Sequence, residues 1–238
     1  MKKHIPNMIT SLNVVCGIAG VVFAFKGRCD LAFILMLCAG VFDFCDGLAA
    51  RALGAYSEMG RELDSLCDLV SFGVLPSVML YNASKVCKMT ESWVCWTPLL
   101  ITVFSALRLA KFNVDPRQTH GFLGLPVPAC AIFVGSLCCY VAHDQSCFLA
   151  LWCAGEVFVP ALSVCLSALL VSEIPMFSLK FSRSDDNALL RGKRLAFAAK
   201  VVASLAVCFI CRLHWSVAPL LVFAVYIIVN VLYRVFKI

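Results

Sequence analysis

The stretch VFDFCDGLAARALGAYSEMGRELDSLCDLV (residues 41–70) carries four aspartates among apolar residues: Asp43, Asp46, Asp64 and Asp68. An ionised carboxylate at the centre of a membrane helix costs about 2.5–3.5 kcal/mol. Within each pair the acids are three or four residues apart, so each pair lies on one face of a helix. The short polar connection at residues 54–62 makes the two helices antiparallel neighbours. The two acidic pairs are therefore predicted to converge on one point.

The composition of the whole chain is that of an integral membrane protein. Of its 238 residues, 62% are hydrophobic and 14% are charged, whereas soluble domains carry about 25% charged residues. Apolar runs of about 17 residues or more predict transmembrane helices. The predicted fold class is all-α, a polytopic membrane bundle of about eight helices, with a six-helix core and two C-terminal helices. The predicted helices lie near residues 8–25, 31–53, 64–81, 93–112, 126–142, 148–172, 195–211 and 216–234.

The distribution of basic residues predicts the orientation of the bundle. With a cytoplasmic N-terminus, most Lys and Arg residues fall on inner loops or at inner helix ends. Both termini and all four aspartates are then expected near the cytoplasmic face. The net charge of +6 suits anionic lipid headgroups and requires no nucleic acid. The first apolar segment is long enough to span and lacks a small-residue cleavage site, so we expect no cleavable signal peptide.

The fifteen cysteines do not indicate a disulfide framework. Most of them lie within apolar runs, where a free cysteine behaves as a small hydrophobic residue. The C-x-x-C pair Cys208 and Cys211, with His214 three residues on, is weak evidence for a metal or redox site inside an apolar helix. We interpret this pair as packing.

The acidic pairs point to divalent metal ions. Four clustered carboxylates could not all stay ionised without positive charge between them. Mg²⁺ or Mn²⁺ takes oxygen ligands, and two such ions form the clamp used in phosphoryl transfer. Gly47 exposes backbone where a ligand can approach, and Arg51 offers a forked cation for a phosphate. The alternative is that the acids pair with Arg51, Arg61 or Arg108 and merely hold the helices together.

The same residues form a motif. The pattern D-x2-D-G-x2-A-R-x8-G-x3-D-x3-D is matched by Asp43, Asp46, Gly47, Ala50, Arg51, Gly60, Asp64 and Asp68. In this motif the chain resembles the CDP-alcohol phosphatidyltransferases.

The resemblance implies transfer of a phosphatidyl group from a CDP-linked lipid to a small alcohol, by a homodimer. It places two metal ions on the four aspartates, with Asp68 also as general base. The CDP-lipid contacts would fall on Asp46, Gly47, Arg51 and Gly60. Asn7 and Thr10 are further candidates for the CDP-lipid site, with capping of the first helix as the alternative role.

Other segments of the sequence indicate which alcohol accepts the phosphatidyl group. IPNMITSLNVVCGIAG (5–20), ELDSLCDLVSFGVLPSVMLY (62–81), SALRLAKFNV (105–114) and GLPVPA (124–129) are similar to the membrane-embedded bacterial phosphatidylserine synthases. This similarity implies CDP-diacylglycerol and L-serine as substrates, in a bacterial cell (inner) membrane. Lys111 departs from the expected Arg, and Cys130 departs from the expected Ala.

Charge provides an independent argument for serine. Arg108, Lys111, Asn113 and Ser105 are the candidates for binding this acceptor, because a serine substrate carries a carboxylate. The alternative is that Arg108 and Lys111 only anchor the helix at the inner face.

Two other functions remain open at this stage. A sibling enzyme could use glycerol 3-phosphate or inositol, and a cation transporter could use the acids as ligands. A transporter predicts acids around a midplane site and repeated halves, neither of which the sequence displays. We expect a transferase core at residues 1–175, a cytoplasmic polar loop at 176–194 and a C-terminal helix pair at 195–238.

Overall fold

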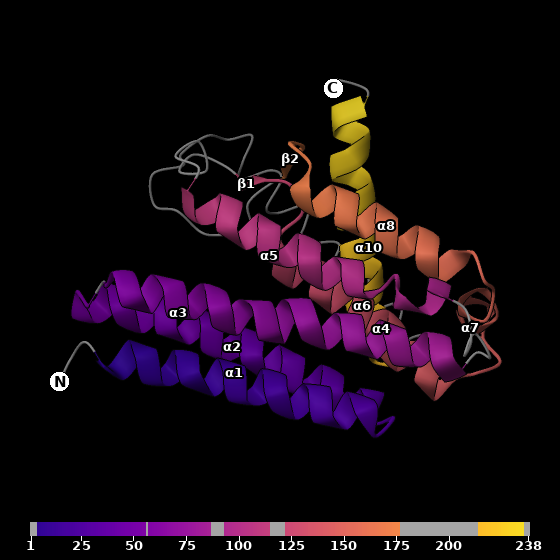
Figure 1. The fold of residues 1–238 in the computed structure, drawn as a ribbon, viewed down its shortest axis with the longest axis horizontal. Helices are drawn as coiled ribbons and strands as arrows, with labels where there is room; N and C mark the ends of the chain where they lie inside the picture. The colour runs from indigo at the N-terminus through magenta and orange to yellow at the C-terminus, as the bar shows by residue number, and fades with distance from the viewer. Residues whose placement is uncertain (1–3, 56, 87–92, 115–121, 177–213, 236–238) are drawn as a thin grey trace.

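The computed structural model describes residues 4–55, 57–86, 93–114, 122–176 and 214–235. The described residues are almost entirely helical, as predicted (Figure 1). The elements are α1 (His4–Phe25), α2 (Cys29–Leu53), α3 (Glu58–Asp68), the π-helix η1 (Leu69–Val74), α4 (Leu75–Val86), the 3-10 turn η2 (Trp93–Trp96), α5 (Leu99–Val114), β1 (Phe122–Leu123), α6 (Val127–His143), α7 (Phe148–Cys153), α8 (Phe158–Val171), β2 (Pro175–Met176) and α10 (Val217–Val235).

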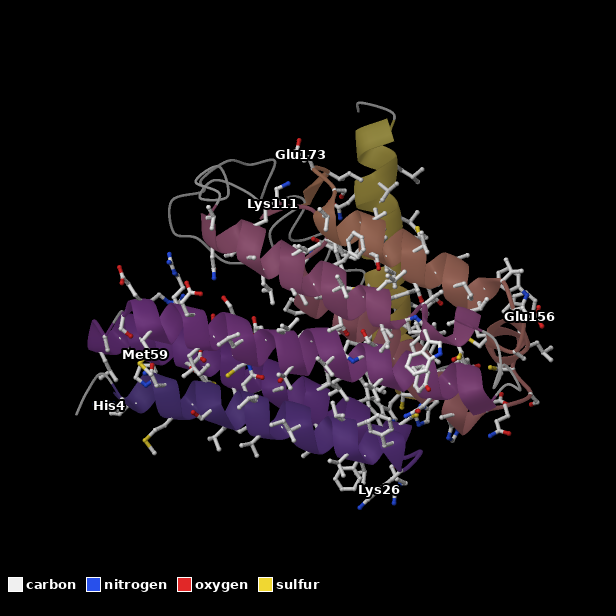
Figure 2. All side chains as sticks on the ribbon, in the orientation of Figure 1. His4, Lys26, Met59, Lys111, Glu156 and Glu173 are labelled. Atoms are coloured by element: carbon white, nitrogen blue, oxygen red, sulfur yellow. The ribbon has the colours of Figure 1, made fainter. Side chains whose placement is uncertain are left out.

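Three long helical rods form one side of the molecule: α1, α2, and a third rod that runs from α3 through α4. In Figure 1, α1, α2 and the continuous helix from α3 through α4 run side by side. Tight connections at 26–28 and 54–57 make α2 antiparallel to both neighbours, so α1 and α3 begin at the same end. Figure 2 accordingly shows His4 and Met59 at one end and Lys26 at the other.

The remaining helices cover this layer. α6 packs against α2, α4 and α10, and α5 packs against α8 and η1. Most of α6 is buried, which makes it the central helix of the bundle. The outer face of α1 is instead apolar and exposed, as expected for a surface that faces lipid; it consists of Ile5, Met8, Leu12, Val15, Ile18 and Val22.

The membrane assignment agrees with the helix lengths. Four described segments are long and apolar enough to cross a membrane: His4–Phe25, Cys29–Leu53, Glu58–Ser84 and Val94–Val114. Three shorter apolar helices follow, at Val127–His143, Phe158–Val171 and Val217–Leu232. The chain is a helical membrane protein, and the predicted fold class is confirmed.

Three predicted helices differ clearly from the structure. In place of the helix predicted at 93–112, the chain forms the 3-10 turn η2 and then α5, which begins at Leu99. The segment predicted as one helix at 148–172 is divided into α7 and α8 by a turn that contains Gly155 and the exposed Glu156. The helix predicted to start at 64 begins six residues earlier, at Glu58, so Asp64 and Asp68 lie inside the helix and do not open it. The helix predicted at 195–211 falls outside the described residues, and so does the polar loop predicted at 176–194 except for its first residue, Met176, which belongs to β2.

A π-helix interrupts the third rod immediately after Asp68. Pro76 has no backbone N–H, so the carbonyl four residues before it cannot receive the usual α-helical bond. Hydroxyl groups supply donors nearby: Ser77 Oγ and Thr102 Oγ1 both donate to the Gly73 carbonyl, at 2.7 and 3.2 Å. Side-chain hydroxyls of this kind stabilise an irregular helix inside a membrane.

A small antiparallel bridge ties together two distant parts of the chain. β1 pairs with β2, with Phe122 opposite Met176 and Leu123 opposite Pro175. Gly124 N donates to the Ile174 carbonyl at 2.9 Å, beside the same bridge. The segment before α6 is thereby held to the segment after α8.

Candidate metal and nucleotide site

Local structure brings the ends of α2 and α3 together. Gly54 closes α2 in the left-handed conformation, with φ at 59°, and its N–H donates to carbonyls of the last turn. Ser57 then caps α3, its Oγ accepting a hydrogen bond from Gly60 N at 3.0 Å. The connection is therefore short, and the acidic stretches of the two antiparallel helices, at residues 43–46 and 64–68, can lie opposite each other.

Three of the four predicted aspartates form one cluster. Asp43, Asp64 and Asp68 each offer a carboxylate oxygen, and these three oxygens lie within 4.8 Å of one another. Hard divalent cations such as Mg²⁺ and Mn²⁺ prefer such oxygen donors. The donor set therefore fits the metal that the sequence predicts, although it does not choose between the two ions.

The fourth aspartate, Asp46, is held differently. Its Oδ2 accepts a hydrogen bond from Thr10 Oγ1 at 2.5 Å. Both residues are buried, with 6% and 3% of their surface exposed. Asp46 thus faces α1, next to the cluster but outside its group of three close oxygens.

A cavity of about 530 Å³ opens beside the cluster. Five of the six residues predicted to contact a CDP-lipid line it: Asn7, Thr10, Asp46, Gly47 and Gly60. Gly60 matters for its size, because a Cβ there would lie 2.9 Å from Ser57 Oγ and 3.1 Å from Asn7 Oδ1.

The sixth residue, Arg51, reaches the edge of this region. Its Nη1 would lie 3.9 Å from a Cβ built on Gly47, one turn earlier in α2, and its side chain is exposed. A guanidinium in this position could bind a phosphate that approaches Gly47.

The cavity is also lined by seven residues that the sequence did not predict for it: Pro6, Ala50, Ala55, Ser57, Glu58, Arg61 and Asp64. Of these residues, Ser57 was the easiest to predict as the start of α3, because a serine just before an acidic first turn is a typical N-cap.

Arg108 lies in the interior, near the acidic cluster. Only 6% of Arg108 is exposed, and its guanidinium lies over the Phe112 ring, 5.5 Å from the centroid. It interacts electrostatically with Tyr226 of α10 and with Asp68. Tyr226 is itself buried, with 4% exposed. Arg108 is thus buried, whereas a cation that snorkels to the membrane surface keeps its charged group in water.

The other predicted acceptor residues are distributed around α5. Asn113 Nδ2 donates to Ser65 Oγ at 2.9 Å, which joins α5 to α3 between Asp64 and Asp68. Ser105 is fully buried, with its Cβ 3.2 Å from a Cβ position on Gly73.

Lys111 forms an ion pair at a distance from the carboxylate cluster. Its Nζ lies 3.6 Å from Glu173 Oε1, beyond the end of α8. In Figure 2 the two labelled side chains lie next to each other above α5, whereas α3 lies below it.

Besides these cavity residues, Asn13 and Tyr226 at the site were not predicted either. Asn13 donates a hydrogen bond from Nδ2 to Asp68 Oδ1 at 3.1 Å. Tyr226 comes from the C-terminal helix, far from the motif in sequence. The spacing of Thr10 and Asn13 on one face of α1 could have indicated Asn13, whereas no sequence signal pointed to Tyr226.

The cysteines of the described residues behave as the sequence suggests. All twelve are free, and several are buried among apolar side chains. Cys208 and Cys211 fall outside the described residues.

Comparison with known proteins identifies the same family. Residues 3–160 match the family described as CDP-alcohol phosphatidyltransferase. The chain is 33% identical over 217 residues to the CDP-diacylglycerol–serine O-phosphatidyltransferase of Mycobacterium tuberculosis (strain H37Rv), an alignment that covers 86% of this chain and 68% of the relative.

Two further relatives match this chain over a shorter alignment. The chain is 37% identical over 126 residues to the CDP-diacylglycerol–serine O-phosphatidyltransferase of Bacillus subtilis, covering 53% of this chain and 70% of the relative. It is 34% identical over 134 residues to the archaetidylserine synthase of Methanothermobacter thermautotrophicus, covering 56% of each chain. The acidic cluster, the adjoining cavity and the family match over residues 3–160 agree, and the chain belongs to the CDP-alcohol phosphatidyltransferase family.

Proposed function

We propose that the protein transfers the phosphatidyl group of CDP-diacylglycerol to the hydroxyl of L-serine, giving phosphatidylserine and CMP. The observation that carries the proposal is the position of the carboxylate cluster directly beside the cavity lined by Asn7, Thr10, Asp46, Gly47 and Gly60. The serine oxygen forms a bond to the phosphorus that bears diacylglycerol. The bond from that phosphorus to CMP breaks, and the serine proton passes to a base.

The proposed nucleotide end of the substrate occupies the cavity. Gly60 leaves room for the Ser57 and Asn7 side chains in the cavity wall, and Thr10 orients the Asp46 carboxylate toward the cavity. Arg51 offers a cation at the rim for a phosphate oxygen. Asp43, Asp64 and Asp68 would hold Mg²⁺ or Mn²⁺, with Asp46 completing the set for two ions. When bound, the ions supply positive charge that neutralises the diphosphate.

Asp68 is the proposed general base. It belongs to the cluster, and Asn13 holds one of its oxygens. A hydroxyl is a weak nucleophile, and a positioned base that accepts its proton typically contributes about 10²- to 10⁴-fold in rate.

Arg108 is the proposed contact for the serine carboxylate. It is a buried cation that interacts electrostatically with Asp68, which supports binding of the serine carboxylate on the same side of the site as the proposed base. Asn113 and Ser105 are proposed to shape the same region. Lys111 is the weaker candidate, because it already pairs with Glu173.

The relatives' names support serine over glycerol 3-phosphate or inositol. The matched proteins from Mycobacterium and Bacillus are named CDP-diacylglycerol–serine O-phosphatidyltransferase, and the archaeal one is named archaetidylserine synthase. A serine acceptor is common to all three names, which favours serine for this chain as well.

The membrane arrangement follows the charge pattern. We propose that both termini and the metal site face the cytoplasm of a bacterial cell, and that the chain works as a homodimer. The transferase core is proposed to occupy residues 1–175, followed by a cytoplasmic polar loop at 176–194 and a C-terminal helix pair at 195–238.

The test is an acceptor panel with purified protein in detergent or nanodiscs. CDP-diacylglycerol and Mn²⁺ or Mg²⁺ are supplied with serine, glycerol 3-phosphate or inositol, and both CMP and the lipid product are measured. The proposal expects phosphatidylserine and CMP with serine alone. Product with another alcohol but not serine would refute the acceptor assignment, and cation flux without CMP from any acceptor would favour transport.

A further inference from the structure

The side chain of Asn13 connects α1 to the carboxylate proposed as general base. Its Nδ2 donates a hydrogen bond to Asp68 Oδ1 at 3.1 Å, and the residue is fully buried (0% exposed). Asn13 lies outside the motif at residues 43–68, so the motif does not explain its presence.

The backbone around Asn13 is fixed against the π-helix. Ser71 Oγ donates to the Asn13 carbonyl at 3.1 Å. One turn further along α1, a Cβ on Gly17 would collide with Ser71 Oγ, so the two helices can approach this closely only with glycine there. Asn13 therefore reaches Asp68 from a backbone with little freedom to shift.

The amide has one orientation that suits the carboxylate. If the amide were rotated by 180°, Oδ1 of Asn13 would face the Asp68 carboxylate. The two oxygens would then repel each other, because both carry negative charge. With Nδ2 toward Asp68, Oδ1 is buried and accepts no hydrogen bond from any residue in the described segments. A buried polar atom without a partner lowers stability. Stability alone would thus favour an apolar side chain at this position, which indicates a functional role.

We propose that Asn13 is a positioning residue, which holds the Asp68 carboxylate in the orientation that binds metal and accepts the proton of the acceptor alcohol. The inference rests on the proposed function of Asp68. One donor fixes one carboxylate oxygen and leaves the other available to the site. Without that donor, the carboxylate would rotate among several orientations.

The experiment uses the full-length protein and a matched control. Asn13→Leu removes the amide while keeping a similar volume. The control is Asn82→Leu, since Asn82 Nδ2 donates to the Ala24 carbonyl at 2.9 Å and so joins α4 to α1 at the far end of the rods. Three quantities are measured on each variant: Mn²⁺ affinity by electron paramagnetic resonance, kcat and KM from CMP release, and thermal stability in detergent.

The proposal expects a specific pattern. For Asn13→Leu, kcat falls by about 10- to 100-fold, as for loss of one hydrogen bond to a charged group. Mn²⁺ affinity falls with it, while both substrate KM values and the melting temperature stay near those of the wild type. For Asn82→Leu, the melting temperature falls, while Mn²⁺ affinity and kcat of the folded fraction do not change.

The opposite pattern would overturn the inference: Asn13→Leu with a lower melting temperature but unchanged Mn²⁺ affinity and kcat of the folded fraction. If Asn13→Leu does not fold, Asn13→Asp has nearly the same shape, and its carboxylate repels Asp68. Undiminished kcat in Asn13→Asp would equally refute the proposal. A wild-type protein that releases no CMP with serine contradicts the proposed function instead, and the Mn²⁺ measurement still tests the role of Asn13 at the metal site.

Discussion

The carboxylate cluster predicts that Asp43→Asn stabilises the metal-free protein while it weakens metal binding. The three oxygens lie within 4.8 Å of one another, so ionised pairs repel by about 3.5 kcal/mol each at an effective dielectric constant of about 20. Replacing Asp43 by the neutral amide removes two of the three pairs, at most about 7 kcal/mol of repulsion. Protonation of the cluster in the metal-free protein lowers this figure, because the acids cannot all stay ionised without a cation. The same change would remove one of the anionic ligands available to metal at this site.

The assay is thermal unfolding in detergent, with EDTA or with Mn²⁺. We expect Asp43→Asn to melt several degrees above the wild type in EDTA. Added Mn²⁺ should stabilise the wild type through mass action and stabilise the variant far less. Mn²⁺ affinity should fall by more than about 100-fold, beyond the loss seen when only a supporting residue is changed, and turnover should be lost.

Asp30→Asn is the matched control, since Asp30 lies in the first turn of the same helix and pairs with the exposed Arg28. It should leave the Mn²⁺ response unchanged. A variant Asp43→Asn that melts below the wild type in EDTA and keeps the full Mn²⁺ shift would refute the reasoning.

Three further substitutions separate the roles of the site residues. Asp68→Asn should lower kcat by about 10²-fold or more, as expected for loss of a general base; near-normal kcat at saturating Mn²⁺ would assign the base elsewhere. Arg108→Ala should raise the KM for serine about 10-fold or more and leave the KM for CDP-diacylglycerol unchanged, because serine is the only one of the two substrates that Arg108 is proposed to contact. The reverse pattern would move Arg108 to the phosphate side. Thr10→Val keeps the shape but removes the donor to Asp46, so it should raise the KM for CDP-diacylglycerol about 10-fold with the serine KM unchanged; equal effects on both substrates would contradict this assignment.

The helices that carry the site could be predicted because their signals are local. Long apolar runs indicate membrane helices wherever they occur, and acids at spacings of three and four residues share a helix face. Both rules apply to residues 41–70, and the structure brings Asp43, Asp64 and Asp68 together as the spacing predicts.

The remaining features depend on contacts between distant segments. Asp46 faces Thr10 because α1 packs along α2, and Lys111 meets Glu173 where the β1–β2 bridge holds two remote segments together. The division of 148–172 into α7 and α8 was also missed, because the turn there contains only one charged residue, Glu156, within an otherwise apolar run. The residue pattern of one segment does not indicate which distant segment will pack against it.

The π-helix at Leu69–Val74 couples the chemistry of the protein to the packing of its bundle. Asp68 immediately precedes this segment, and Leu75 and Met79, both fully buried, follow it. Each helical residue turns the chain by about 100°, so the number of residues between Asp68 and Leu75 sets the angle between the side of the rod that faces the metal site and the side that faces the core. Deleting one residue there would either withdraw Asp68 from the cluster or turn Leu75 and Met79 out of the core. The length of this segment is thus a constraint in its own right, independent of which side chains it contains.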